Sequence, residues 1–180
     1  MGETPGVSDL LVISGPPGSG KSTVAAAVAA SLEPSVLVEG DAFFGFLRGG
    51  TDPWLPEADD QNRRVIEAAG AACGRFAAAG PTVYEGVLGP WFLDAFLRAT
   101  GIAALDYVVL LPPVAVCLER VADRPDHPFA DPSATGQVHG DFAGSGIDPR
   151  HLVTDGTASP SEVAALVRAE RASGRFEVRR

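Results

Sequence analysis

Short apolar runs recur along the chain, and between them lie longer segments with helical spacing of apolar residues. Runs of this kind, bounded by turn residues, are typical of strands buried in a parallel sheet. They predict strands at 10–13, 35–39, 82–85, 105–111 and 151–154. Alternation of strands and helices in this order predicts an α/β fold, a parallel sheet with helices on both faces.

The segments between the runs carry helix signals, from Ala-rich composition to acidic first turns. They predict helices at 23–32, 57–79, 90–100, 114–122 and 160–173. Ser159 and Pro160 give the last helix an N-cap and a proline in its first turn. Residues 43–56 are too rich in Gly, Pro and aromatic residues for a regular element, and 174–180 form a basic tail that is either frayed or a sixth strand.

The residues that follow the predicted strands carry the chemistry. Parallel strands bring their carboxyl ends to one edge of the sheet, where α/β proteins bind their ligands. This rule predicts a single site built from segment 15–23, Asp41, Glu85, the region of Pro112 and Asp155.

Segment 15–23 reads Gly-Pro-Pro-Gly-Ser-Gly-Lys-Ser-Thr, which fits the phosphate-binding pattern G-x-x-x-x-G-K-[ST]. Its glycines allow consecutive N–H groups to point into one concavity at a helix N-terminus, where an anion is favoured. We expect Lys21 to reach the β- and γ-phosphates and Ser22 to bind Mg²⁺. A Gly/Pro-rich turn that fits by chance is the alternative. The strand before the segment, the helix after it, and Lys21 being the only lysine among 14 basic residues favour a nucleotide site.

Composition limits which other functional classes the chain can belong to. A chain of 180 residues suits one domain, 1–180, and its net charge of −9 offers no basic footprint for nucleic acid. No apolar run approaches a membrane span and no secretory signal is visible, so we expect a cytoplasmic protein with no membrane partner. Cys73 and Cys117 lie in apolar helical segments and are expected to be buried thiols.

Two carboxylates follow strands beside the phosphate-binding segment. Asp41 is suited to accept the proton of an attacking hydroxyl, to hold a magnesium-bound water, or merely to cap a helix or lie in a loop. Glu85 stands where P-loop proteins commonly place an acidic residue that supports Mg²⁺, usually Asp. Its longer side chain is also able to reach toward the molecule that is phosphorylated.

Arg120 and Arg124 lie four residues apart near the end of a helix, on one face. They precede a segment broken by three prolines, which suggests a lid at about 124–135 whose guanidinium groups neutralise charge on a transferred phosphoryl group. A solvated helix end is the alternative. We expect Arg124 to lie closer to the phosphates than Arg120.

Aromatic residues cluster in loop 43–56 and again after the third strand, at Trp91 and Phe92. They suggest a partly apolar pocket for a ring-bearing or bulky substrate, with Phe44 in its wall. Core packing under a loop is an equal alternative. Arg63 is a candidate for binding an anionic group on that substrate, or is solvated.

Taken together, these residues resemble the nucleoside-monophosphate-kinase-like group of P-loop kinases, in the style of chloramphenicol phosphotransferase and of gluconate, shikimate and adenylylsulfate kinases. The resemblance spans about residues 10–171 and implies a three-layer P-loop NTPase fold with strand order 2-3-1-4-5 and a small lid. It implies that Asp41 acts as base or binds the phosphoryl acceptor, and that Arg120 and residues 155–158 grip adenine. Glu85-Gly86 departs from the Asp-Gly-x-Pro-Arg pattern of true nucleoside monophosphate kinases, which argues against a nucleotide acceptor.

The sequence therefore predicts an ATP- and Mg²⁺-dependent kinase that phosphorylates a hydroxyl of a small metabolite or antibiotic. A nucleoside or nucleotide kinase and a non-catalytic nucleotide-binding module are the alternatives; a monomer and a homodimer are both compatible. Lys21, Asp41 and Arg124 are the expected catalytic residues, Ser22 and Glu85 the metal-site residues, and Asp41, Phe44, Arg63 and Glu85 the substrate residues. The expected nucleotide-binding residues are Gly15, Pro17, Gly18, Ser19, Gly20, Lys21, Ser22, Thr23, Arg120 and Arg124.

Overall fold

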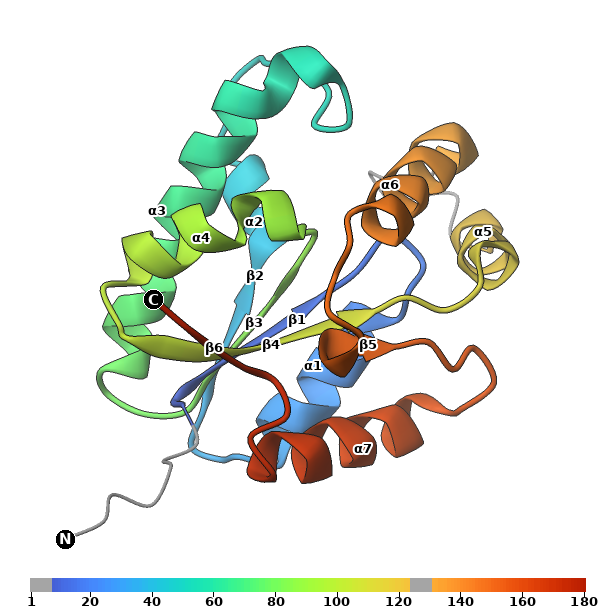
Figure 1. Cartoon of the computed structure of the whole chain (residues 1–180). Coiled ribbons are helices and arrows are strands. Elements are labelled where there is room, and N and C mark those ends of the chain that lie inside the picture. Colours follow the sequence, from blue (N-terminus) through green and yellow to red (C-terminus); the bar gives the residue numbers. More distant parts are fainter. Residues whose placement is uncertain (1–7, 124–130) are drawn as a thin grey trace, which may run out of the picture.

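The computed structural model describes residues 8–123 and 131–180 of the chain. Its centre is a twisted sheet between two layers of helices (Figure 1). The parallel strands follow the order β2-β3-β1-β4-β5, which confirms the expected topology. Their bounds are β1 (Leu10–Ser14), β2 (Val36–Glu39), β3 (Thr82–Gly86), β4 (Ala104–Leu110) and β5 (Leu152–Val153).

The C-terminal tail forms a sixth strand, β6 (Glu177–Arg179), which was one of the two expectations for it. It pairs antiparallel with the first half of β4, while the short β5 pairs with the second half. The two short strands thus share one edge of β4. The tail closes the amino end of that edge and leaves the carboxyl end to β5.

Each central strand contributes to two hydrophobic cores, because successive side chains point to opposite faces of a sheet. In β1, Leu10 and Val12 pack with α3 (Asp59–Ala77) and α4 (Pro90–Thr100). Leu11 and Ile13 pack on the other face with α1 (Lys21–Ala30) and α7 (Pro160–Ala172). All four side chains are fully buried, which explains why the sequence shows an unbroken apolar run there.

Helices α3 and α4 lie against each other at very short range, and Gly74 makes this approach possible. A Cβ atom at Gly74 would lie 1.9 Å from the carbonyl oxygen of Thr100. Cys73 beside it is buried, as expected, and burial raises the pKa of its thiol to about 12. Cys117 is also buried and unpaired.

The structure corrects two parts of the predicted element order. The first two residues of the predicted loop 43–56 belong to a helix, α2 (Gly40–Phe44). This helix follows β2 directly and has Asp41 in its first turn. A short 3-10 helix, η1 (Pro56–Ala58), then leads into α3. Predicted helix ends at 90–100 and 114–122 coincide with α4 and α5 (Val114–Ala122).

The second correction is a helix that was not predicted, α6 (Pro132–Gly144). Asp131 caps it by accepting a hydrogen bond from the Ser133 amide, and Pro132 stands in its first turn. These start signals were present in the sequence, but three glycines in the helix hid it. The last residues of the predicted lid, 132–135, form the first turn of α6, whereas residues 124–130 lie outside the described part.

Two further features complete the fold. A buried ion pair joins Arg171 on α7 to Asp106 on β4 at 2.9 Å, which ties the last helix to the sheet. The 3-10 helix η2 (Pro149–His151) precedes β5. Within residues 8–123 and 131–180, none of the helices combines the length and the apolar character that a membrane crossing requires.

Candidate active site

Residues 15–20 form the turn between β1 and α1, and their backbone angles match the sequence expectation. Gly15, Gly18 and Gly20 have φ angles of 148°, 75° and 94°, which side-chain-bearing residues rarely adopt. Gly18 also passes close to α5, since a Cβ atom there would lie 2.3 Å from the Cys117 carbonyl oxygen. Helix α1 begins at Lys21 with neither a side-chain cap nor an acidic residue in its first turn. Its N-terminus is therefore left open toward an anion.

A pocket opens above this turn, which we call the Lys21 pocket. Its lining residues come from the turn, from α1, α2 and α5, and from the segment after β3: Pro17, Gly18, Gly20, Lys21, Ser22, Thr23, Asp41, Val87, Arg120 and Val121. Lys21 is only 8% exposed. An amine so deeply placed beside free helix N–H groups is suited to bind a polyanion.

Ser22, which lines the Lys21 pocket, is in contact with Glu85 of β3. The Ser22 hydroxyl donates a hydrogen bond to a Glu85 carboxylate oxygen over 3.1 Å. Glu85 is buried, and this burial raises the pKa of its carboxyl group; Lys21 and the Ser22 hydrogen bond oppose the shift, while Asp41 and Glu39 add to it. A divalent cation would offset the repulsion among these carboxylates.

The oxygen donors of Ser22 and Glu85 fit Mg²⁺, a hard cation that takes few protein ligands and completes its shell with phosphate and water oxygens. Among the described residues there is no group of three or more His, Cys, Asp or Glu side chains suited to hold a metal by themselves. A site of this composition suits a cation that arrives with a nucleotide.

Arg120 bridges the phosphate-binding turn and the loop after β5. Its guanidinium group donates to the carbonyl oxygens of Gly18, Ser19 and Gly156, each over 3.4 Å. It also lines a second pocket, the Arg120 pocket, whose wall includes Asp155, Ala158 and Val163. The structure thus brings together Arg120 and the 155–158 loop, as the family resemblance implied. Arg124 lies outside the described residues.

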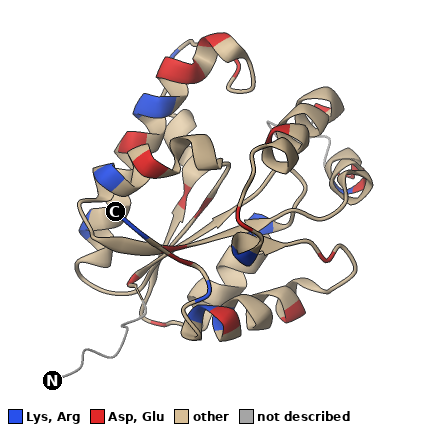
Figure 2. Cartoon of the chain, in the orientation of Figure 1, with Lys and Arg blue, Asp and Glu red and all other residues tan. Residues whose placement is uncertain are grey.

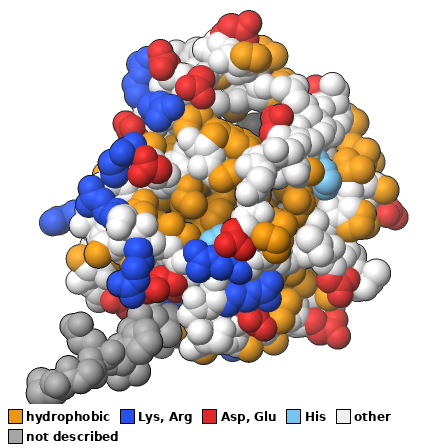
Figure 3. All heavy atoms as spheres, in the orientation of Figure 1, with side chains coloured by type: hydrophobic (Ala, Val, Ile, Leu, Met, Phe, Trp, Pro, Cys, Tyr) orange, Lys and Arg blue, Asp and Glu red, His pale blue; other side chains and the backbone are white. Residues whose placement is uncertain are grey.

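A much larger hollow, the aromatic cavity, lies beside the Lys21 pocket and has a volume of about 650 Å³. In the space-filling view the molecule is hollowed between α3 and α6, and hydrophobic side chains floor the hollow (Figure 3). Its apolar lining comes from the phosphate-binding turn, α2, the loop before η1, η1 itself, α3, the segment after β3, α4 and α6. The apolar lining residues are Pro17, Phe44, Pro53, Trp54, Leu55, Pro56, Ile66, Val87, Trp91, Phe92, Ala134 and Val138. Its polar lining residues are Asp41, Asp59, Asn62, Gln137, Asp141 and Ser145.

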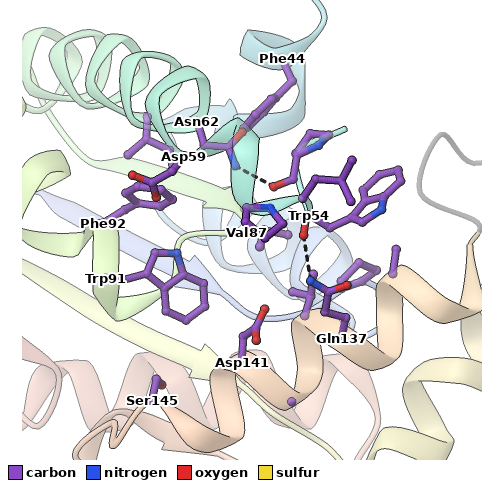
Figure 4. Close-up of a pocket in the computed structure, with 18 of the residues that line it drawn as sticks. Phe44, Trp54, Asp59, Asn62, Val87, Trp91, Phe92, Gln137, Asp141 and Ser145 are labelled. Atoms are coloured by element: carbon purple, nitrogen blue, oxygen red, sulfur yellow. Dashed lines mark hydrogen bonds between the residues drawn. The ribbon is translucent and has the colours of Figure 1, made fainter. Parts of the chain in front are cut away.

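Residues 45–55, between α2 and η1, form a loop that we call the aromatic loop. Two amide side chains hold it over this cavity by hydrogen bonds (Figure 4). The Asn62 amide nitrogen donates to the Pro53 carbonyl oxygen over 2.7 Å. From the opposite wall, the Gln137 amide nitrogen donates to the Trp54 carbonyl oxygen over 2.8 Å. Helix α6 and the loop therefore meet across the cavity, an arrangement that could not be predicted from the sequence.

The predicted substrate residues differ in where they lie. Asp41 lines both the Lys21 pocket and the aromatic cavity, and Phe44 lines the cavity. Arg63 is not among the residues that line the cavity. It pairs with Asp59 at 3.6 Å, and its guanidinium carbon lies over the Phe92 ring, 5.5 Å from the ring centre. Asn62 and the residues of α6 were missed, because only packing of distant segments brings them to the site.

Comparison with known proteins places these observations in a family context. A family model described as an AAA domain matches residues 10–143. No curated protein matches the sequence significantly.

Solved structures share the fold at low sequence identity. A gluconokinase from Sinorhizobium meliloti 1021 is 24% identical with a TM-score of 0.65, and the match covers 94% of each chain. A sugar kinase from Janibacter sp. HTCC2649 is 21% identical with a TM-score of 0.66, covering 92% of this chain and 96% of that one. The Deinococcus radiodurans tunicamycin resistance protein is 20% identical with a TM-score of 0.65, covering 89% and 94%. At these identities the likeness concerns the fold.

Proposed function

Because the chain belongs to the AAA-domain family AAA_33, whose matched region contains the phosphate-binding turn, we propose that it is a kinase that transfers the γ-phosphoryl group of ATP to a hydroxyl of a small molecule. Structures of the same fold include proteins named as a gluconokinase and a sugar kinase, which supports the choice of a small-molecule acceptor. The proposal includes Mg²⁺ as the cation that accompanies ATP.

One observation carries this proposal: Asp41 lines both the Lys21 pocket and the aromatic cavity. A carboxylate at the junction of a polyanion pocket and a second, ligand-sized cavity is placed to act on a hydroxyl directed at the terminal phosphate. A protein that only binds or hydrolyses a nucleotide has no need of the second cavity.

In the proposed reaction the acceptor lies in the aromatic cavity with its hydroxyl at Asp41. As the oxygen–phosphorus bond to the acceptor forms, the bond from phosphorus to the ADP oxygen breaks, and the hydroxyl proton passes to the Asp41 carboxylate. Lys21 and the open N-terminus of α1 hold the β- and γ-phosphates in line with that oxygen. The apolar walls exclude water, which limits transfer to water instead of the acceptor.

Mg²⁺, when bound with ATP, would neutralise part of the charge on the phosphates. Ser22 and Glu85 are the residues that would hold it, directly or through water. Arg120 would secure the base side of the nucleotide, since it joins the phosphate-binding turn to the 155–158 loop.

The proposal is tested in two measurements. Calorimetric titration of the protein with Mg·ATP is expected to release or absorb heat, and a panel of hydroxyl compounds is expected to contain one that stimulates ADP release. Heat on titration with no stimulation by any acceptor would favour a nucleotide-binding module instead. Absence of any heat would remove the nucleotide site itself.

A further inference from the structure

The polar groups of the aromatic cavity are almost all negative or hydrogen-bond accepting, and this bias points to the charge of its occupant. Three carboxylates line it, Asp41, Asp59 and Asp141, whereas the described lining residues include no Lys, Arg or His. Figure 2 shows the acidic positions on the first turns of α3 and on α6. An anionic occupant would meet only repulsion from these carboxylates.

The two amides of the cavity strengthen the bias. Asn62 and Gln137 each donate one amide N–H to a backbone carbonyl oxygen, and these bonds orient the two amides. The Asn62 Oδ1 atom is buried and has no partner among the described residues, in a side chain that is 8% exposed. This buried oxygen adds a partial negative charge to the cavity wall, so it favours a positive occupant by its field and not by contact.

Asp141 is the carboxylate best placed to meet a positive charge. It points from α6 into the space between Trp91 and Gln137 (Figure 4). Asp59 already pairs with Arg63, and Asp41 lies at the junction with the Lys21 pocket, whereas Asp141 has no ion-pair partner among the described residues. The neighbouring Trp91 ring is 44% exposed and offers the π face that an ammonium group prefers.

We propose that the phosphoryl acceptor is an amphiphilic amino alcohol: a hydroxyl compound with an aromatic or similarly bulky apolar body and a protonated amine that binds Asp141 beside Trp91. This inference rests on the proposed kinase function and specifies the substrate class of the same cavity. The apolar body packs against the aromatic walls, the hydroxyl reaches Asp41, and the protonated amine binds Asp141.

Three compounds that share a phenyl ring and a benzylic hydroxyl test the charge preference: 2-amino-1-phenylethanol, 1-phenyl-1,2-ethanediol and mandelate. At neutral pH they carry a positive charge, no charge and a negative charge. The chain's only two tryptophans, Trp54 and Trp91, both line the cavity, so intrinsic fluorescence reports binding without nucleotide or turnover. For molecules of about ten heavy atoms we expect dissociation constants in the millimolar range.

The amine is expected to bind about five- to tenfold more tightly than the diol, and mandelate more weakly than both. Asp141→Asn should bring the amine and the diol to about equal affinity. Asp94→Asn is the matched control, because Asp94 carries the same charge, is exposed on α4, pairs with Arg98 and does not line the cavity; it should preserve the preference.

Equal binding of the amine and the diol by the unmodified protein, tighter binding of mandelate, or no binding of the amine at about 20 mM would overturn the inference. So would an amine preference that survives Asp141→Asn. Because fluorescence is read without ATP, these outcomes concern the charge of the acceptor only. Failure of the kinase proposal would appear separately, as binding of the amine with no acceptor-dependent ADP release by any compound.

Discussion

The Lys21 pocket and the aromatic cavity share a border at Asp41 but are built in opposite ways. The Lys21 pocket comes mainly from one continuous segment, the turn between β1 and α1, and its chemistry is that of main-chain N–H groups and basic side chains. Apart from Pro17, the aromatic cavity is assembled from segments between residues 41 and 145, and its chemistry is that of rings and carboxylates. The first is suited to a charged group common to many nucleotides, and the second is the proposed site of the phosphoryl acceptor.

This difference explains how one fold accepts many substrates. Backbone geometry at a helix N-terminus depends on a few glycines, so it tolerates little change. Walls made of side chains from a loop and a separate helix are able to change one residue at a time without disturbing the sheet. Variants of the two regions should therefore have separable effects, and the following predictions test that separation.

The variant that should affect the chain most is Asp41→Asn, because this residue belongs to both regions. Loss of the base should lower kcat ~10²- to 10⁴-fold. Affinity for Mg·ATP should stay nearly unchanged, since the amide retains the size of the carboxylate. Steady-state kinetics and calorimetry check the two halves, and activity equal to that of the unmodified protein would remove Asp41 from the mechanism.

Lys21→Ala should act on the nucleotide side alone. Loss of the buried amine should lower kcat ~10²- to 10³-fold and weaken ATP binding. The fluorescence change on adding 2-amino-1-phenylethanol should persist, because Lys21 does not line the aromatic cavity. Loss of that response in a folded variant would show that the two regions are not separable.

Glu85→Gln should lower the affinity for Mg²⁺ ~10- to 100-fold. The same substitution should make the nucleotide-free protein more stable. Burial raises the pKa of Glu85 in the folded protein, so its contribution to stability is largest at low pH and is lost as pH rises through that raised pKa. The nucleotide-free variant should therefore gain Tm over the unmodified protein, and the gain should grow from pH 5 to pH 8. A gain that is constant across this range would show that the ionisation of Glu85 is not its cause.

The smallest expected effect comes from Gly140→Leu in α6. Gly140 lines the aromatic cavity, and a Cβ atom there would meet nothing within 4 Å, so the added side chain should fill part of the cavity. We expect about a tenfold loss in kcat/KM for the best acceptor, an unchanged KM for ATP, and a helix more stable by ~0.5–1 kcal/mol. Gly136→Leu is the matched control, because Gly136 is equally open but does not line the cavity. It should share the gain in Tm and keep the activity, and equal losses in both variants would count against the cavity as the acceptor site.

The features that could be predicted from the sequence divide in the same way between the Lys21 pocket and the aromatic cavity. Strand order, both faces of the sheet and the positive φ angles of the phosphate-binding turn were predicted correctly. Helix α6 was missed, because glycine lowers helix propensity and tertiary packing overrides it. Gln137 and Asp141 were missed with it, and Asn62 carried no local signal in the middle of an amphipathic pattern.

The sequence by itself determined the nucleotide side of this protein, because a phosphate-binding turn is a property of neighbouring residues along the backbone and needs only a strand before it and a helix after it. The tertiary structure alone decided what the second cavity contains. Packing of α3 and α6 against the aromatic loop orients the amides of Asn62 and Gln137 and sets the Asp141 carboxylate in the cavity wall. Which atoms of a side chain are left for a ligand depends on the partners it meets, and those partners are distant in sequence.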